Sequence, residues 1–377
     1  MLMKSESRPI RVLHCTTKLG TGGVQSFLRS YAAYMDPQQV VFDFAVQTNT
    51  PQQYDQEISA LGGKIFHVHP MRDSVVKYFF DIYKVCKTNP EIVVIHSHLN
   101  FRNFIPLLAA RMAGVKVRIS HSHSCYESKS IVKAVARKIF QLCLPLFATE
   151  CWGCSEKANS WLYGSDKADC AIVHNAISVD TYAFDERVRT DIRNTMSLKN
   201  NLVLIHVGTF GAAKNHEFLL ALFSVLKQRR ENAKLLLCGD GPLRENIEKK
   251  ISELKLGDAV ILLGMTNNIS ELLMAADVFV LPSLYEGLPL SAVEAQASGI
   301  PCVVSNSVPS EAIFMRNVCV CSQFDAPLWC SAIEKVFSCS TERCGGAKAA
   351  REAGYDTSIE AAKLQNLYLS CVGSKEK

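Results

Sequence analysis

The sequence predicts an α/β protein with two doubly wound, Rossmann-like parallel sheets, one in each half of the chain. Short runs of β-branched and apolar residues alternate with helical stretches of about 10–15 residues, which is the pattern of βαβ units. The alternation pauses at about residues 174–200 and then starts again. A chain of 377 residues is also long enough for two domains of roughly 150–200 residues each. We therefore expect each sheet to be covered by helices on both faces.

The first half of the chain alternates apolar strands with longer helical patterns. The expected strands are Ile10–His14, Val40–Val46, Lys64–Val68, Ile92–His96, Val115–Ser120 and Glu150–Cys154. The expected helices between them are Ser26–Met35, Tyr54–Leu61, Val75–Cys86, Phe104–Ala113 and 129–147. Strands that alternate with helices in this way predict a parallel sheet.

The second half repeats the same organisation. Its expected strands are Leu202–Val207, Lys234–Cys238, Val260–Leu263, Val278–Leu281 and Pro301–Ser305. Its expected helices are 215–230, Leu243–Lys255, Ile269–Ala276 and Leu290–Ser298. Such sheets bind ligands in a crevice outside the carboxyl ends of their strands, so we expect a ligand cleft between the two domains.

The pause in the alternation sets the expected domain boundaries. We expect an N-terminal Rossmann-like domain over 1–180 and a second one over 181–355. A C-terminal helix over 356–377 is expected to pack back on the N-terminal domain.

Composition and charge exclude several classes of protein. The chain is 48% hydrophobic and 20% charged, which is typical of globular proteins and far from disordered ones. Its net charge of +5 is mild and includes no block of five or six like charges. Nucleic-acid binding usually leaves a stronger basic footprint, so we expect no nucleic-acid partner.

The ends and the cysteines indicate a cytoplasmic location. The N-terminus up to Pro9 is polar, and no run of about 18 uninterrupted apolar residues occurs, so neither a signal peptide nor a membrane span is predicted. The 15 cysteines are scattered, several of them inside apolar strands, and are expected to be free thiols in a reducing compartment. Cys151 and Cys154 form a single CxxC without a second ligand pair, which does not predict a metal or redox site.

A loop-to-helix segment after the strand Val278–Leu281 has the chemistry of an anion site. Pro289 suits a first helical turn because its missing N–H would have no partner there. The amides of Leu290 and Ser291 then lie at the positive end of a helix dipole, where a diphosphate binds readily. Glu286 and Glu294 flank this turn, and carboxylates accept hydrogen bonds from sugar hydroxyls. Alternatively, Glu286 caps the helix and Glu294 is an exposed helix residue.

At this segment the sequence resembles a known family. The run Glu286-Gly-Leu-Pro-Leu-Ser-Ala-Val-Glu294-Ala-Gln-Ala-Ser-Gly is similar to the E-x7-E signature of the family 4 retaining glycosyltransferases, which have the GT-B fold. Further family features appear in order along almost the whole chain: Gly22-Gly23-Val-Gln, His206-Val-Gly-Thr-Phe with Lys214-Asn-His, Gly239-Asp-Gly-Pro and Leu263-Gly264. The chain looks most like the enzymes of capsule and exopolysaccharide assembly.

The resemblance implies that the domain over 1–180 lies on the acceptor side and that the domain over 181–355 binds the nucleotide-sugar donor. It also implies a role for each of these positions. Glu294 would bind the ribose of a nucleotide, and Glu286 would lie by the donor sugar. Lys214 would neutralise the leaving β-phosphate, for which preorganised positive charge is the strongest catalytic contribution. The remaining donor-binding positions implied are Gly22, Gly23, Thr209, Gly264, Gly287, Leu288, Leu290 and Ser291.

One position departs from the family pattern. The pattern usually has arginine directly after the glycine at position 208, and this chain has Thr209. A threonine hydroxyl supplies one neutral hydrogen bond, whereas charge-assisted bonds are roughly twice as strong. This departure leaves three alternatives. Donor binding is weaker, another residue compensates for the missing charge, or the enzyme is impaired.

The loop Lys18-Leu-Gly-Thr-Gly22-Gly23 follows the first strand and precedes a helix. It lacks the third glycine of a dinucleotide-binding fingerprint. Its missing side chains would instead let backbone amides approach a diphosphate or an acceptor. The alternative is a purely structural tight turn.

Two His-Ser-His runs, His96–His98 and His121–His123, stand at the ends of predicted strands. Alternation places both histidines of a run on one side of the sheet, so four imidazoles are expected to line the cleft. A metal cluster would need further ligands, and no carboxylate or thiolate completes a set, so no metal and no cofactor is predicted. The resemblance implies that His121 lies beside the reacting sugar, with His123 as the nearest alternative and His98 as a further acceptor-side candidate. Satisfied structural histidines are the other interpretation.

The segment 129–147 combines basic and apolar residues in a helical pattern. Such a helix suits the surface of an anionic membrane, where a lipid-linked acceptor would be presented. A core helix with a solvated face fits the pattern equally.

Together these features predict a retaining glycosyltransferase. The donor would be a nucleotide diphosphate sugar, UDP-linked rather than GDP-linked, and the acceptor a lipid-linked saccharide in surface polysaccharide assembly. The enzyme would work in the cytoplasm, at the inner face of the cytoplasmic membrane. A GT-B sugar-nucleotide epimerase and a catalytically impaired nucleotide-sugar-binding protein are the alternatives.

Overall fold

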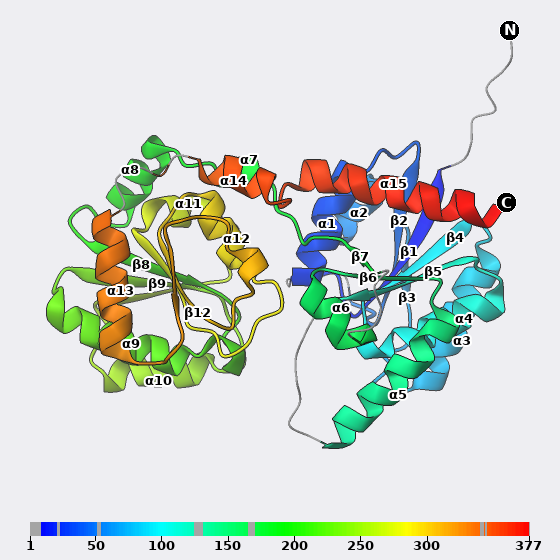
Figure 1. Cartoon of the computed structure of the whole chain (residues 1–377), viewed down its shortest axis with the longest axis horizontal. Coiled ribbons are helices and arrows are strands. Elements are labelled where there is room, and N and C mark those ends of the chain that lie inside the picture. The colour runs from blue at the N-terminus through cyan, green and yellow to red at the C-terminus, as the bar shows by residue number, and fades with distance from the viewer. Residues whose placement is uncertain are drawn as a thin grey trace, which may run out of the picture. The chain divides into compact units, whose positions relative to one another are not determined.

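The chain folds into two compact units, each built around one parallel sheet (Figure 1). The computed structural model describes residues 9–20, 23–50, 54–123, 131–164, 170–339, 343 and 345–376. The first unit contains the described residues up to Ala176 together with those from Thr357 onward, and the second unit contains Ile177–Asp356. Two parallel α/β sheets confirm the predicted fold class.

The first unit has a seven-stranded sheet in the order β3-β2-β1-β4-β5-β6-β7. Its strands are β1 (Ile10–Thr16), β2 (Val40–Val46), β3 (Ile65–His67), β4 (Ile92–Ser97), β5 (Val117–Ser122), β6 (Glu150–Gly153) and β7 (Ala171–Ile172). Its helices are α1 (Gly23–Tyr34), α2 (Asp55–Ala60), α3 (Val75–Thr88), the 3₁₀ helix η1 (Asn100–Asn103), α4 (Phe104–Ala113), α5 (Ile131–Phe147), α6 (Glu156–Tyr163) and α15 (Thr357–Glu376). The strand order reverses between β1 and β4.

Helices cover both faces of this first sheet. On one face α1 packs beside α15, the red helix of Figure 1, over a core that includes Phe27, Phe44 and Tyr368. On the other face α3, α4, α5 and α6 follow one another over a second core that includes Leu13 and Leu107. Because both faces are covered, central strands are buried and mostly apolar, as in β2, where all seven residues are buried and the one charged residue, Asp43, pairs with Arg11.

The second unit has a six-stranded sheet in the order β10-β9-β8-β11-β12-β13. Its strands are β8 (Leu202–Val207), β9 (Ala233–Cys238), β10 (Val260–Gly264), β11 (Val278–Leu281), β12 (Cys302–Ser305) and β13 (Val318–Cys321). Its helices are α7 (Val179–Tyr182), α8 (Glu186–Thr195), η2 (Ala212–Lys214), α9 (His216–Arg229), α10 (Arg244–Glu253), α11 (Ile269–Ala275), α12 (Leu290–Ala297), η3 (Ser310–Ala312), α13 (Ala326–Cys339) and α14 (Gly346–Glu352). Here the strand order reverses between β8 and β11.

A buried carboxylate joins α8, the second helix of this unit, to its sheet. Asp277 accepts hydrogen bonds from Arg189 at 2.6 Å, from Arg193 at 3.1 Å and from the backbone amide of Val203 at 2.8 Å. Bonds to ionised groups are the strong class of hydrogen bond. This network therefore fixes α8 against the amino ends of β8 and β11, which are the two strands at the reversal.

The ends of each predicted strand lie within two residues of their predicted positions, and β5 is shifted at both ends. The strand predicted at Val115–Ser120 begins at Val117 because Gly114 ends α4 in the left-handed conformation, at a φ of 95°, and the amide of Val115 is used by the carbonyl of Ala110. The strand then continues to Ser122, so His121 lies inside it. The short strand β13 and the helices α13 and α14 were not predicted.

Across the described residues, no helix combines the length and the apolar character needed to cross a bilayer.

Candidate functional site

The reversal of strand order in the second unit brings Lys214 and Glu286 together. Lys214 ends η2, in the connection after β8, and Glu286 follows β11, the neighbouring strand. The Nζ of Lys214 lies 2.6 Å from Oε1 of Glu286, and the same oxygen accepts a 2.6 Å hydrogen bond from the hydroxyl of Ser283. Both charged side chains are mostly buried, so Lys214 is not a solvated loop lysine.

A glycine makes room for the lysine side chain. A Cβ built on Gly208 would lie 2.9 Å from Cε and 3.1 Å from Cδ of Lys214. Carbon atoms in ordinary contact are about 3.5–4.0 Å apart, so any side chain at position 208 would push Lys214 aside. The lack of a side chain at Gly208 therefore determines where the ammonium lies.

The loops after β8, β9 and β10 are held together by their backbones. The amide of Gly208 donates to Cys238, that of Phe210 to Asp240, and that of Gly239 to Gly264. Gly239 has a φ of +147°, and a Cβ there would lie 2.0 Å from the carbonyl oxygen of Gly208. Glycine is required for this close approach. Thr209 is exposed in the loop after β8. Gly264, with a φ of +64°, ends β10.

The helix α12 begins next to the Lys214–Glu286 pair. Its N-cap is Pro289 and no side chain caps it, so Glu286 pairs with Lys214 and does not cap the helix. The first amides of a helix have no intrahelical acceptor, so those of Leu290 and Ser291 remain available to a ligand. Gly287 and Leu288 form the preceding loop, where Leu288 is buried and Gly287 is partly exposed.

Glu294 is a partly buried residue of α12, held by a tyrosine from α7. The hydroxyl of Tyr182 hydrogen-bonds to its carboxylate. Burial raises the pKa of Glu294 to about 6, against opposing contributions from Tyr182 and from the charge of Lys214. This carboxylate is thus an acceptor whose charge changes near neutral pH.

Two buried histidines lie close to these loops: His206 in β8 and His216 at the start of α9. His206 donates from Nδ1 to the carbonyl oxygen of Val280 at 2.9 Å, and its ring meets that of His216 edge-on with the ring centres 4.9 Å apart. Burial lowers the pKa of both, to about 4 for His216. They are therefore neutral at pH 7 and add no positive charge beside Lys214.

In the first unit the reversal of strand order brings five histidines together. They come from three neighbouring strands and the residues just after them: His14 from β1, His96 and His98 from β4, and His121 and His123 from β5. All point to the face that α1 and α15 cover, and Phe27 of α1 contacts three of the rings. His14, His96, His98 and His121 are buried, and His123 is partly exposed. The four predicted imidazoles thus share one side of the sheet, where most of them are covered.

These histidines are hydrogen-bonded to one another. His96 Nε2 lies 2.9 Å from His121 Nδ1, and His96 Nδ1 lies 2.6 Å from the hydroxyl of Tyr368 on α15. His98 links His14 Nδ1, at 2.9 Å, to His123 Nε2, at 2.7 Å. Burial lowers the pKa of every ring, to about 3 for His14 and His123, so the cluster is uncharged at neutral pH.

The glycine loop before α1 is described only in part. Gly22 lies outside the described residues, and Gly23 is the first residue of α1. Space around Gly23 is open, since a Cβ built there would meet nothing within 4 Å. No steric need for a glycine is visible at this position.

Four residues of these two sites were missed by the sequence analysis. His14 and Ser283 each carried a signal, because both stand at the carboxyl end of a strand next to a predicted site strand. Tyr182 and Tyr368 carried none, since each meets its partner only through the tertiary fold, 112 and 272 residues away in the chain respectively.

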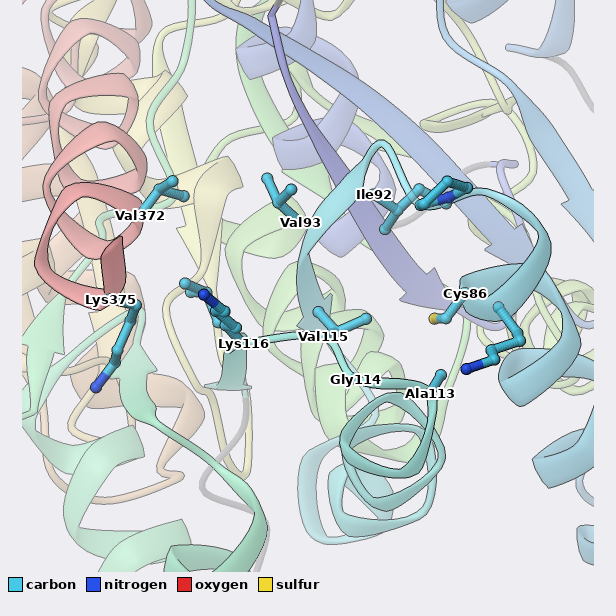
Figure 2. A pocket seen from close by; sticks show the side chains of 12 residues that line it. Cys86, Ile92, Val93, Ala113, Gly114, Val115, Lys116, Val372 and Lys375 are labelled. Carbon is cyan, nitrogen blue, oxygen red and sulfur yellow. The ribbon is translucent and has the colours of Figure 1, made fainter. Parts of the chain in front are cut away.

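A separate cavity lies at the opposite edge of the first sheet. It has a volume of about 340 Å³ and is lined by residues at the start of β4 and β5, by the end of α4 and by α15 (Figure 2). Figure 2 labels Ile92, Val115, Lys116, Val372 and Lys375 among them. Ligands of doubly wound sheets bind at the carboxyl edge, so this amino-edge cavity is not part of the candidate site.

Comparison with known proteins identifies the family. The family described as "Glycosyl transferases group 1" matches residues 188–353, which lie in the second unit. EpsF of Bacillus subtilis (strain 168), which carries a glycosyltransferase name, is 32% identical over 371 residues, covering 95% of this chain and 96% of EpsF. The chain belongs to the group 1 glycosyltransferases. This family is the GT4 family with the GT-B fold, as the sequence resemblance implied.

Two further relatives of this glycosyltransferase carry more specific names. The UDP-Gal:alpha-D-GlcNAc-diphosphoundecaprenol alpha-1,3-galactosyltransferase of Escherichia coli is 28% identical over 66% of this chain and 65% of that protein. The capsular polysaccharide biosynthesis glycosyltransferase CapH of Staphylococcus aureus is 25% identical over 87% of this chain and 91% of CapH. The relatives of this glycosyltransferase thus include an enzyme of polysaccharide biosynthesis.

A solved structure shows the same fold. HepE of Anabaena, in complex with UDP-glucose, superposes on this glycosyltransferase with a TM-score of 0.79 over 96% of this chain and 99% of HepE, at 15% sequence identity.

Replacing Gly208 tests the placement of Lys214. We expect Gly208→Ala to change the free energy of unfolding by less than about 1 kcal/mol, because the atoms that it displaces belong to a flexible side chain. The rate of glycosyl transfer should nevertheless fall by at least about tenfold, because the displaced ammonium of Lys214 no longer lies where the reaction needs its charge. Gly211→Ala is the control, since a Cβ there comes no closer than 4.0 Å to its neighbours. Equal transfer rates for the two variants would contradict the argument.

Proposed function

We propose that this glycosyltransferase moves a sugar from a UDP-sugar to a lipid-linked saccharide during surface polysaccharide synthesis, with retention of anomeric configuration. The observation that carries the proposal is the Lys214–Glu286 pair beside the uncapped start of α12. One cation, one carboxylate and a helix N-terminus suit a sugar diphosphate, which presents hydroxyls next to an anion.

The diphosphate binds at the start of α12. The amides of Gly287, Leu288, Leu290 and Ser291 donate to it, and the helix dipole favours its negative charge. Lys214 leaves Glu286 and neutralises the β-phosphate as the glycosidic bond breaks. Because the leaving group gains charge in the transition state, this contact accelerates the reaction more than it tightens binding.

The rest of the donor binds to the neighbouring loops of the same unit. Glu294 accepts hydrogen bonds from the ribose hydroxyls, and Glu286, once Lys214 turns to the phosphate, accepts from the donor sugar. Thr209 donates one neutral hydrogen bond to the phosphates, and Gly264 lets the nucleotide approach the end of β10. Gly22 and Gly23 are further donor-binding positions that we propose from the family resemblance alone.

The first unit serves the acceptor side of the reaction. We place the reacting sugar against the rings of His121 and His123, which stack on each other, with His98 behind them. The Nε2 of His121 is a buried ring nitrogen without a hydrogen-bond partner among the described residues. An unpaired buried donor or acceptor costs roughly 1–3 kcal/mol, which a sugar hydroxyl would offset.

The choice of donor and acceptor is supported by the names of related proteins. HepE was crystallised with UDP-glucose, and the Escherichia coli relative is named for a UDP-galactose donor and a diphosphoundecaprenol acceptor. CapH is named for capsular polysaccharide synthesis. Uridine donors and lipid-linked acceptors are therefore the substrates to test first.

We propose further that α5, the helix in the segment 129–147, rests on an anionic membrane surface. Val135, Ile139, Leu142 and Leu146 are exposed and recur at helical spacing, which places them on one stripe of the helix. Lys138 is exposed next to this stripe. An apolar stripe with basic neighbours is the pattern of a helix that lies in a bilayer interface, where lipid-linked acceptors are presented.

The test of the function is transfer with a defined donor and acceptor. Purified chain is given UDP-glucose, UDP-galactose, UDP-N-acetylglucosamine or GDP-mannose, together with a sugar diphosphoundecaprenol acceptor in vesicles. We expect acceptor-dependent release of UDP and a product whose NMR coupling shows a retained anomer. Lys214→Ala should lower kcat by roughly 10²–10³-fold, since it removes one preorganised charge from the transition state.

Lys199→Ala is the matched control for Lys214→Ala, because Lys199 is exposed before the amino end of β8. Three outcomes contradict the proposal. These are conversion of a UDP-sugar to its isomer without acceptor, transfer from GDP-mannose alone, and a wild-type chain that binds donor without turnover while Thr209→Arg is active.

Glu294 predicts a pH dependence of donor binding. Its pKa of about 6 means that the carboxylate takes up a proton between pH 7 and pH 5 and then accepts fewer hydrogen bonds from the ribose. We expect the Kd for UDP-glucose to rise about tenfold over that range, in proportion to the loss of the ionised form. UDP-glucose is the suitable ligand because its diphosphate is esterified at both ends and does not titrate there.

The matched variant for this measurement is Glu294→Gln. Its Kd for UDP-glucose should be higher than that of the wild type at pH 7 and independent of pH. The fold itself is not weakened through this group, because a pKa raised by folding means that protonation favours the folded state as the pH falls. The Kd values of both proteins are measured by isothermal titration calorimetry at pH 5, 6 and 7. The same pH dependence in both proteins would refute the assignment of Glu294 to the ribose.

The stripe on α5 is tested by sedimentation with vesicles of phosphatidylglycerol and phosphatidylethanolamine. Leu142, which is 71% exposed, is replaced by Asp. We expect vesicle binding about tenfold weaker, because the variant no longer buries this leucine in the bilayer interface and carries a negative charge that anionic lipids repel. Leu328→Asp is the control, since Leu328 is 57% exposed on α13 of the second unit. Wild-type protein that stays in the supernatant, or two variants that bind alike, would exclude the contact.

A further inference from the structure

The five histidines of the first unit form two hydrogen-bonded rows. The first row runs from Tyr368 through His96 to His121, and its two rings are inclined by only 11°. The second row is His14, His98 and His123. The rows lie side by side, since the ring centres of His96 and His98 are 4.2 Å apart with the rings tilted by 36°, and His121 stacks on His123 at 4.0 Å.

This stacking argues against a metal ion held by His98, His121 and His123. Two groups of three of these histidines have ring nitrogens within 4.8 Å of one another. The lone pair of an imidazole lies in the plane of its ring, however, and the rings of His121 and His123 are inclined by only 16° at 4.0 Å. Lone pairs in nearly parallel, stacked planes do not converge on one ion. The nitrogens are directed along each row, as a chain of hydrogen bonds requires.

The first row has a direction that Tyr368 sets. Tyr368 is completely buried, and within the described residues its hydroxyl has His96 Nδ1 as its one hydrogen-bond partner. A phenol has a single proton, and if that proton pointed elsewhere it would be buried without an acceptor, at a cost of roughly 1–3 kcal/mol. Tyr368 therefore donates to Nδ1 of His96. A neutral His96 then carries its proton on Nε2 and donates it to Nδ1 of His121.

We propose that Tyr368, acting through His96, holds His121 in the tautomer with its proton on Nε2, so that His121 meets the reacting sugar as a hydrogen-bond donor. Tyr368 and His96 are positioning residues in this scheme, and His121 is the group that contacts the substrate. The inference rests on the proposed function for the contact with sugar, whereas the tautomer follows from the hydrogen bonds alone.

This assignment separates two roles that a histidine can take. An Nε2 that carries a proton cannot act as a general base. It can hold a hydroxyl or ring oxygen of the sugar in place while the leaving group departs on the other side. The low pKa of the buried His121 fits this role, since the ring then stays neutral and keeps one proton over the working pH range.

The tautomer is measured directly by NMR of chain labelled with ¹⁵N-histidine. The chain has 10 histidines, and the signals of His121 are identified as those that disappear in His121→Gln. We expect wild-type His121 to show the Nε2–H pattern. In Tyr368→Phe, which lacks only the hydroxyl, the bias is lost, and we expect a mixture of the two tautomers.

Kinetics of the same variants test the consequence. Tyr368→Phe should lower kcat about tenfold, which is the value of roughly one hydrogen bond in the transition state, and leave KM for the UDP-sugar within about twofold. The matched control is Tyr31→Phe. Tyr31 is also completely buried in this unit, and its hydroxyl donates to the carbonyl oxygen of His174 at 2.6 Å, outside the histidine rows. Its kcat and its His121 signals should equal those of the wild type.

Three results would overturn the inference. The first is wild-type His121 with its proton on Nδ1, which can be seen even if the variants fold poorly. The second is an unchanged tautomer in Tyr368→Phe. The third is stoichiometric binding of Zn²⁺ or Co²⁺ that removes the ring N–H signals, which would make the cluster a metal site. If the tautomer shifts as expected but even wild-type chain transfers no sugar, the hydrogen-bond relay stands and the proposed function fails.

Discussion

The reversal of strand order in each sheet is the constraint on which both candidate sites depend. In a parallel sheet the chain leaves every strand at the carboxyl edge, and where the order reverses, consecutive helices go to opposite faces and leave that edge open. In the second unit this happens between β8 and β11, so Lys214 and Glu286 meet although 72 residues separate them. In the first unit it happens between β1 and β4, where His14 meets His98.

Much of this arrangement could be predicted from the sequence because it follows from local patterns. Apolar strands alternating with helices defined both sheets, and Pro289 marked the start of α12. The expectation that Lys214 and Glu286 bind one ligand came from the family resemblance, since alternation says which edge a loop occupies but not which side chains touch. Their ion pair and the hydroxyl of Ser283 that supports it emerged only from the structure.

What could not be predicted depends on burial and on contacts between distant elements. The four histidines of the two His-Ser-His runs were expected to line a cleft, yet Phe27 of α1 and Tyr368 of α15 cover most of that face. Neither helix has a sequence pattern that predicts these contacts, because an aromatic residue on an amphipathic helix predicts burial but does not identify the residues that it packs against. The pKa of Glu294 depends in the same way on Tyr182, from another helix.

The pairing of Lys214 with Glu286 has a consequence for the position where the family pattern has arginine. A mostly buried ammonium is costly unless it is paired, and Glu286 supplies the partner that keeps Lys214 in place over Gly208. The pair is electrically neutral, so with Thr209 in place of arginine the positive potential in this loop comes mainly from the amides and dipole of α12. Under the proposed function, Lys214 would add its charge only when a phosphate draws it from Glu286. Positive charge supplied in this way as the leaving group forms would favour the transition state over the bound donor.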